Sequence, residues 1–179
     1  MAERIAELDR LTEYLAASGV VPAEGFRPHP LGAESPGYPG ADDRLRTFAT
    51  ATSTGSSYAI WLRDDRAPLA SLPVVFLADE GGLGLVARDF REFLRVLATG
   101  WSPWGGWHGV EYDDEDTAAE EGEGAAFRAW LAAEFGIAPA TDPNEVVRAT
   151  EAELWEPFAA WIGPLYPDVV AARATPGGP

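Results

Sequence analysis

The chain has 179 residues, of which 46% are hydrophobic and 23% are charged, so it is long enough to bury the core of one globular domain. Its net charge of −16 makes nucleic acid a poor partner, because a field of this sign repels phosphate groups. The absence of cysteine excludes disulfides, thiolate metal sites and cysteine nucleophiles.

The first predicted element is an amphipathic helix over residues 2–18, where leucines recur at helical spacing and Gly19 can end the helix. This segment carries both signs of charge, so we expect no secretory signal. No apolar run in the chain reaches the roughly 18 residues of a membrane span. We therefore expect a cytoplasmic protein without membrane contact. Residues 20–43 are rich in proline and glycine and predict irregular structure, with one short strand near Phe26.

Four short runs of β-strand character follow. Residues 45–50 and 57–63 alternate in character, and the small residues between them suit a hairpin turn. Residues 73–77 form an apolar, β-branched run typical of a buried strand, and residues 84–87 follow a turn of acidic residues and glycine. Because these turns are short and parallel neighbours need long crossovers, we expect one mostly antiparallel sheet of about four to six strands.

An amphipathic helix is predicted over residues 89–99 and is expected to pack on this sheet. Its apolar residues recur at i, i+3, i+4 and i+7, and Asp89 with Glu92 matches a capping-box pattern. Gly100 can end the helix.

Two further helices are predicted towards the C-terminus, over residues 125–135 and from Pro143 to about Ile162. Pro157 is expected to kink or divide the second. No internal repeat or linker is evident, so we predict a single α+β domain over residues 1–166 and a frayed tail, rich in proline and glycine, over residues 167–179.

The block from Phe48 to Gly100 carries a family resemblance. A hairpin of small residues leads into the strand SYAIWLR, the strand PVVFL ends in an acidic turn with two glycines, and the strand GLVA runs into a helix rich in Phe and Leu. This order resembles bacterial members of the SUKH superfamily, which includes the Smi/Knr cell-wall-assembly regulators. Residues 20–43 lack the Leu-Pro, aromatic and Asn-Gly-Gly stretch of many relatives, so the chain resembles a divergent subgroup.

The resemblance implies an α+β fold in which helices flank a central, largely antiparallel sheet. It also implies a frequent role as an immunity protein, which binds and neutralises a cognate toxin that is often a nuclease. Other relatives are regulatory binding proteins without enzymatic activity.

Negative charge is concentrated in the C-terminal part of the chain. Residues 1–110 carry 14 acids against 10 arginines, whereas residues 111–179 carry 15 against 3. Within this part, residues 111–123 hold eight acids and no base. Two interpretations stay open: a solvated, mobile loop, or a surface that attracts a basic protein. An EF-hand calcium loop is disfavoured because Ala118 occupies the position that requires glycine, and we expect no metal or cofactor.

Three tryptophans, Trp101, Trp104 and Trp107, recur at every third position, but the intervening proline and glycines exclude a regular helix. Tryptophan is often a hot spot of protein interfaces, and it also seals the edges of cores. Core sealing is the favoured interpretation for most of the three, and Trp104 and Trp107 are retained as candidate interface anchors. The predicted protein-binding residues combine the acids with these anchors: Asp113, Asp114, Glu115, Asp116, Glu120, Glu121, Trp104 and Trp107.

No catalytic residues are predicted. His29 and His108 are the two histidines, and neither has an acidic neighbour at metal-ligand spacing. The hydroxyls at residues 54–57 fit a hairpin turn better than a nucleophile motif. The leading hypothesis is therefore a non-enzymatic domain that binds a basic protein, with a toxin domain as one candidate. The alternatives are an intracellular regulatory or scaffold protein of the same fold and, third, a hydrolase that uses a hydroxyl and a carboxylate.

Overall fold

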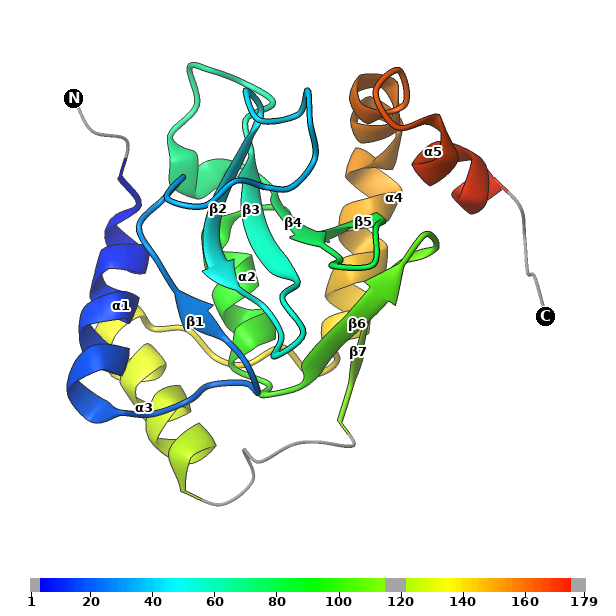
Figure 1. Cartoon of the computed structure of the whole chain (residues 1–179). Helices are drawn as coiled ribbons and strands as arrows, with labels where there is room; N and C mark the ends of the chain where they lie inside the picture. The colour runs from blue at the N-terminus through cyan, green and yellow to red at the C-terminus, as the bar shows by residue number, and fades with distance from the viewer. Residues whose placement is uncertain (1–3, 115–121, 175–179) are drawn as a thin grey trace.

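A five-stranded antiparallel sheet lies at the centre of the computed structural model, which describes residues 4–114 and 122–174 (Figure 1). Each strand pairs with the next along the chain: β1 (Arg27–Pro28), β2 (Leu45–Thr50), β3 (Ser57–Trp61), β4 (Val74–Leu77) and β5 (Leu83–Ala87). The α+β class, the antiparallel arrangement and the four predicted strand runs are confirmed, and β1 matches the short strand expected near Phe26.

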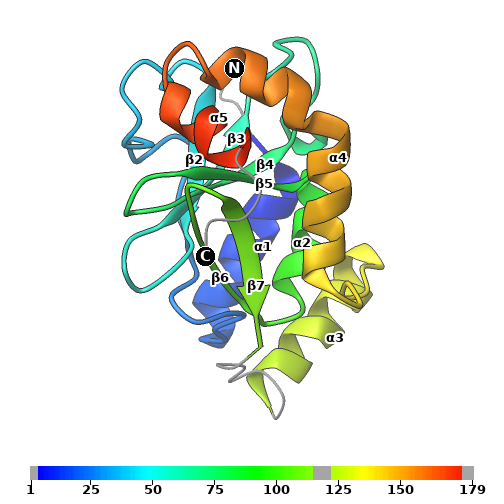
Figure 2. The same cartoon turned by 90° about the vertical axis from the view of Figure 1, so that its right-hand side faces the viewer.

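Helices cover both faces of this sheet (Figures 1 and 2). One face carries α1 (Ala6–Ser18), α2 (Phe90–Leu97) and α3 (Glu123–Phe135), and the other carries α4 (Pro143–Ile162) and α5 (Pro167–Ala174). A short 3₁₀ turn, η1 (Leu69–Ser71), precedes β4. No helix in the described part of the chain is long and apolar enough to cross a membrane.

Two cores result from the alternation of side chains along the strands. In β3, Tyr58 and Ile60 enter the core under α1 and α2, whereas Ala59 and Trp61 enter the core under α4. β3, β4 and β5 are therefore buried on both faces, and this explains their nearly continuous apolar sequences.

Side-chain hydrogen bonds cap the N-termini of α2 and α4. Asp89 accepts a hydrogen bond from the backbone N–H of Glu92 at 2.7 Å, which confirms one half of the predicted capping box. The carboxylate of Glu92 accepts from the backbone N–H of Arg88 at 2.8 Å, one residue before the cap. Asp142 caps α4 by accepting from the backbone N–H of Asn144 at 2.8 Å. Pro157 does not divide α4, which continues to Ile162 and curves in its second half (Figure 2).

Residues 167–174 form the helix α5, which corrects the prediction of a frayed tail for this part of residues 167–179; residues 175–179 lie outside the described residues. Arg173, at the end of α5, has a side chain that is 10% exposed. Its guanidinium donates to Glu151 Oε1 at 2.5 Å and to the carbonyl of Leu83 at 3.0 Å, and it lies 4.3 Å from the ring centre of Trp155. These contacts hold α5 against α4 and β5.

A two-stranded hairpin, β6 (Ser102–Gly106) and β7 (Gly109–Asp113), lies beside β5 and is not among the predicted strands (Figure 2). It approaches the β4–β5 turn through glycines. A Cβ atom on Gly82 would lie 2.3 Å from the carbonyl carbon of Gly106, and one on Gly84 would lie 2.8 Å from the amide nitrogen of Val110. The hairpin therefore docks on the main sheet by contact between backbones, which larger residues would prevent.

We expect Gly82→Ala to destabilise the fold because it combines this clash with a φ of 97°, which L residues rarely adopt. The free energy of unfolding should fall by about 2 to 3 kcal/mol, as measured by denaturant titration. Gly55→Ala is the matched control, since Gly55 also has positive φ but nothing lies within 4 Å of its added Cβ. Equal losses in the two variants would show that backbone strain alone matters and that the contact with the hairpin does not.

Candidate functional site

The β6–β7 hairpin presents tryptophan and acidic side chains on its outer face. Its register pairs Trp104 with Glu111 and Ser102 with Asp113, so these residues lie on the same side. The alternate residues face inward and are buried: Pro103, Val110 and Tyr112. Trp104 is 57% exposed and Trp107, near the tip, is 44% exposed. The structure thus places both predicted anchors at the surface.

Two buried contacts hold the hairpin in place. The hydroxyl of Tyr112 lies 2.9 Å from that of Tyr58 in β3, and burial raises the pKa of both phenols, so both stay protonated. Asn144, in the first turn of α4, accepts from the backbone N–H of Tyr112 at 2.8 Å and donates to its carbonyl at 2.9 Å. The amide side chain therefore bonds to the outer edge of β7 as a neighbouring strand would.

A cavity of about 450 Å³ opens between β6 and the turns of the main sheet. One wall is β6 itself, from Ser102 to Gly105, and the opposite wall is formed by the β2–β3 and β4–β5 turns. Its lining is rich in hydroxyls and carboxylates and contains no basic residue: Glu24, Thr52, Ser53, Thr54, Ser56, Phe76, Asp79, Glu80, Ser102, Pro103, Trp104, Gly105 and Asp113. The cavity therefore combines negative charge with an exposed indole ring.

Asp79 is the best-anchored carboxylate of this cavity. It accepts a hydrogen bond from the hydroxyl of Ser56 at 2.7 Å, and this bond, more than any other contact, holds the pKa of Asp79 below its usual value. Asp79 is thus ionised at neutral pH. No histidine lines the cavity, so the pair lacks the imidazole base that usually activates a serine nucleophile.

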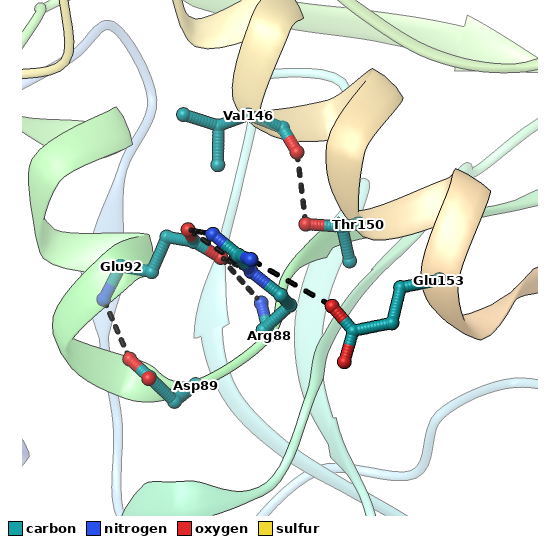
Figure 3. A network of polar contacts seen from close by, with 6 residues as sticks. All are labelled: Arg88, Asp89, Glu92, Val146, Thr150 and Glu153. Atoms are coloured by element: carbon teal, nitrogen blue, oxygen red, sulfur yellow. Dashed lines mark hydrogen bonds and ion pairs between the residues drawn. The ribbon is translucent and has the colours of Figure 1, made fainter.

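A second charged cluster, at the N-terminus of α2, is organised around one arginine, Arg88 (Figure 3). Arg88 forms hydrogen bonds with Glu92 and lies 3.6 Å from Glu153 of α4. Burial alone would raise the pKa of Glu92, but the hydrogen bonds and charge of Arg88 outweigh it and lower that pKa. This cluster links α2 to α4 and pairs the carboxylates of Glu92 and Glu153 with Arg88.

The predicted binding residues are only partly placed by the structure. Asp113 ends β7 beside the cavity and Asp114 follows it, exposed. The other predicted acids lie outside the described residues: Glu115, Asp116, Glu120 and Glu121. Among the described residues, no three acidic or histidine side chains are grouped so that they could hold a metal ion.

The remaining tryptophans and the histidines lie elsewhere. Trp101 is half-buried against the core. Three further tryptophans lie in α3 and α4, and their partly buried rings confirm the predicted packing role: Trp130, Trp155 and Trp161. His29 lies 3.5 Å from Glu34, and His108 is exposed at the turn between β6 and β7.

Three acids of the cavity are absent from the predicted site: Glu24, Asp79 and Glu80. At Asp79 and Glu80 the sequence predicts only the turn between β4 and β5, and it gives no sign of a binding site. Glu24 lies beside the β2–β3 turn because its neighbour Gly25 packs against the backbone of Thr52 and Ser53. The three acids lie close together only in the folded chain, so no local sequence pattern predicts the cavity.

The residues that carry the resemblance to the SUKH superfamily, 48–100, fold as the unit from β2 to the end of α2. Such an order of strands and helix describes a fold and does not identify a family by itself. The chain matches no protein-family model, no curated protein and no solved structure, so membership of that superfamily stays a prediction.

Proposed function

We propose that this chain is a non-enzymatic protein-binding domain whose binding surface is the outer face of the β6–β7 hairpin. The observation that carries the proposal is the exposure of Trp104 on a hairpin that is otherwise fixed by buried contacts. A large exposed aromatic side chain on a rigid element is typical of an interface hot spot, because binding removes it from water at little entropic cost.

The charge of the chain favours a basic partner. Trp104 lies opposite Glu111 and next to the carboxylates of the cavity, within a chain of net charge −16. Complementary charge chiefly raises the association rate and the specificity of a complex. The resemblance to SUKH immunity proteins supports a toxin domain as this partner, and a cytoplasmic location accords with that role. An intracellular regulatory partner of the same charge is the alternative.

The test is capture of the partner by the wild-type chain and by Trp104→Ala. We expect truncation of Trp104 to weaken binding about 30-fold, the effect of a hot spot worth about 2 kcal/mol. Isothermal titration with the captured partner measures the dissociation constant. Leu165→Ala is the matched control, since Leu165 is 42% exposed but lies in the turn between α4 and α5. A partner that binds wild type and Trp104→Ala equally would contradict the proposal.

Co-expression then separates a toxin from a regulatory partner. If the partner is a toxin, its expression alone should arrest growth and co-expression of this chain should restore it. The Trp104→Ala variant should restore growth less well than wild type. A partner that is harmless alone would favour the regulatory alternative.

A further inference from the structure

We infer that the cavity beside β6 is a pocket for one arginine side chain, presented by an extended segment of the partner protein. This inference rests on the proposed function and names the chemistry that the site would recognise. Three independent features of the described residues support it: three carboxylates without a paired arginine, an exposed indole ring, and an edge of β6 without a neighbouring strand.

Three carboxylates of the cavity have no paired arginine in the described part of the chain. Glu24, Asp79 and Glu80 line the cavity, and no arginine among residues 4–114 and 122–174 pairs with any of these three. Asp79 is in addition held in place by Ser56 at 2.7 Å, so part of the site is already ordered for a positively charged ligand. A guanidinium suits such a site because its planar donors can reach several oxygens at once.

The same molecule contains a filled example of this arrangement. The guanidinium of Arg173 lies 4.3 Å from the ring centre of Trp155, pairs with a carboxylate of Glu151 at 2.5 Å, and donates to the carbonyl of Leu83 at 3.0 Å. The cavity offers the corresponding groups in the ring of Trp104, its carboxylates and the backbone of β6. No arginine of the described residues lines the cavity, so the guanidinium would come from the partner.

The outer edge of β6 provides the backbone groups. Asn144 bonds to the N–H and carbonyl of Tyr112, so these two groups face away from β6. Tyr112 and Pro103, which lie opposite each other, therefore form a pair that is not joined by hydrogen bonds between the strands. By the same alternation, the N–H and carbonyl of Gly105 face away from β7, and no strand among residues 4–114 and 122–174 pairs with β6 on that side.

The hydroxyl of Ser102, at the start of β6, is a further polar group that an added segment could bond to. Its hydroxyl oxygen is shielded from solvent and has no hydrogen-bond partner among the described residues. Addition of an extended segment along β6 would satisfy these groups and place a side chain in the cavity.

The test uses the full chain and a synthetic pentapeptide, acetyl-Thr-Val-Arg-Val-Thr-amide. The matched peptides replace arginine by citrulline, which keeps the shape but not the charge, or by lysine. Binding is followed in ¹H–¹⁵N spectra by the indole N–H signal of Trp104, which is assigned by its loss in Trp104→Phe. We expect the arginine peptide to bind at least about tenfold more tightly than the citrulline peptide, and more tightly than the lysine peptide.

Asp79→Asn should weaken binding of the arginine peptide several-fold, and Asp65→Asn, an exposed charge outside the cavity, should leave it unchanged. Unchanged ¹H–¹⁵N signals elsewhere in each variant show that it is folded. Equal binding of the arginine and citrulline peptides, equal binding of the lysine peptide, or no shift of the Trp104 signal would each overturn the inference. If the peptide fails while Trp104→Ala still loses the captured partner, the arginine pocket is wrong and the proposed binding face stands.

Discussion

Replacement of Phe93 by alanine is expected to lower the free energy of unfolding by about 4 kcal/mol. Phe93 is fully buried in α2, and its ring lies 4.8 Å from that of Tyr58, 5.2 Å from that of Phe48 and 5.7 Å from that of Phe90, measured between ring centres. Alanine would leave a cavity among these rings, which belong to both the helix and the sheet and cannot close it without moving. Denaturant titration measures the loss.

Two controls show whether the lost ring is the cause. Phe93→Leu keeps most of the apolar volume and should cost less than half as much as alanine. Arg95→Ala, on the exposed side of the same helix, should change stability by no more than about 0.5 kcal/mol. A loss below about 2 kcal/mol for Phe93→Ala would mean that the core closes around the missing ring and that α2 is less firmly packed than the structure indicates.

Asn144→Ala is expected to cost about 3 kcal/mol, because it leaves both the N–H and the carbonyl of buried Tyr112 without a partner. Asn144 is the only asparagine of the chain, and the chain contains no glutamine, so no other carboxamide can replace it. The loss should appear in denaturant titration and as faster amide exchange of the hairpin, which this side chain ties to α4.

Asn144→Asp separates the two hydrogen bonds. A carboxylate can accept from the N–H of Tyr112 but repels its carbonyl, so this variant should also be destabilised. Glu156→Ala, at an exposed position of the same helix, is the control and should lie within about 0.5 kcal/mol of wild type. Wild-type stability of both Asn144 variants would show that water replaces the amide at the edge of β7.

The predictable parts of the fold are those whose local signals agree with their packing. β3 to β5 have apolar sequences, short turns join β2 to β3 and β4 to β5, and α2 combines a cap at Asp89 with a clear apolar face. The β6–β7 hairpin escaped prediction because Pro103, Gly105 and Gly106 are poor strand residues. The glycines that let it dock, Gly82 and Gly84, lie about 20 residues earlier in the chain.

The helix α5 escaped prediction for a different reason. Its sequence is short and is followed by a stretch rich in proline and glycine, and it is stabilised by contacts of Arg173 with α4 and β5 that are remote in sequence. The predicted anchors Trp104 and Trp107 are exposed, whereas the cavity beside them required Glu24, Asp79 and Glu80 to meet from separate turns. Sequence patterns report neighbours along the chain and not those produced by folding.

The glycine contacts between the hairpin and the β4–β5 turn have a consequence for how such a protein can evolve. Substitutions of Gly82, Gly84 or the buried residues of β7 would disturb the packing of the hairpin on the sheet. The side chains at positions 104 and 111 point outward and are exposed, so mutations there should change binding more than folding. A lineage with this architecture can therefore acquire a new partner by drift at the outer positions while its scaffold is inherited intact.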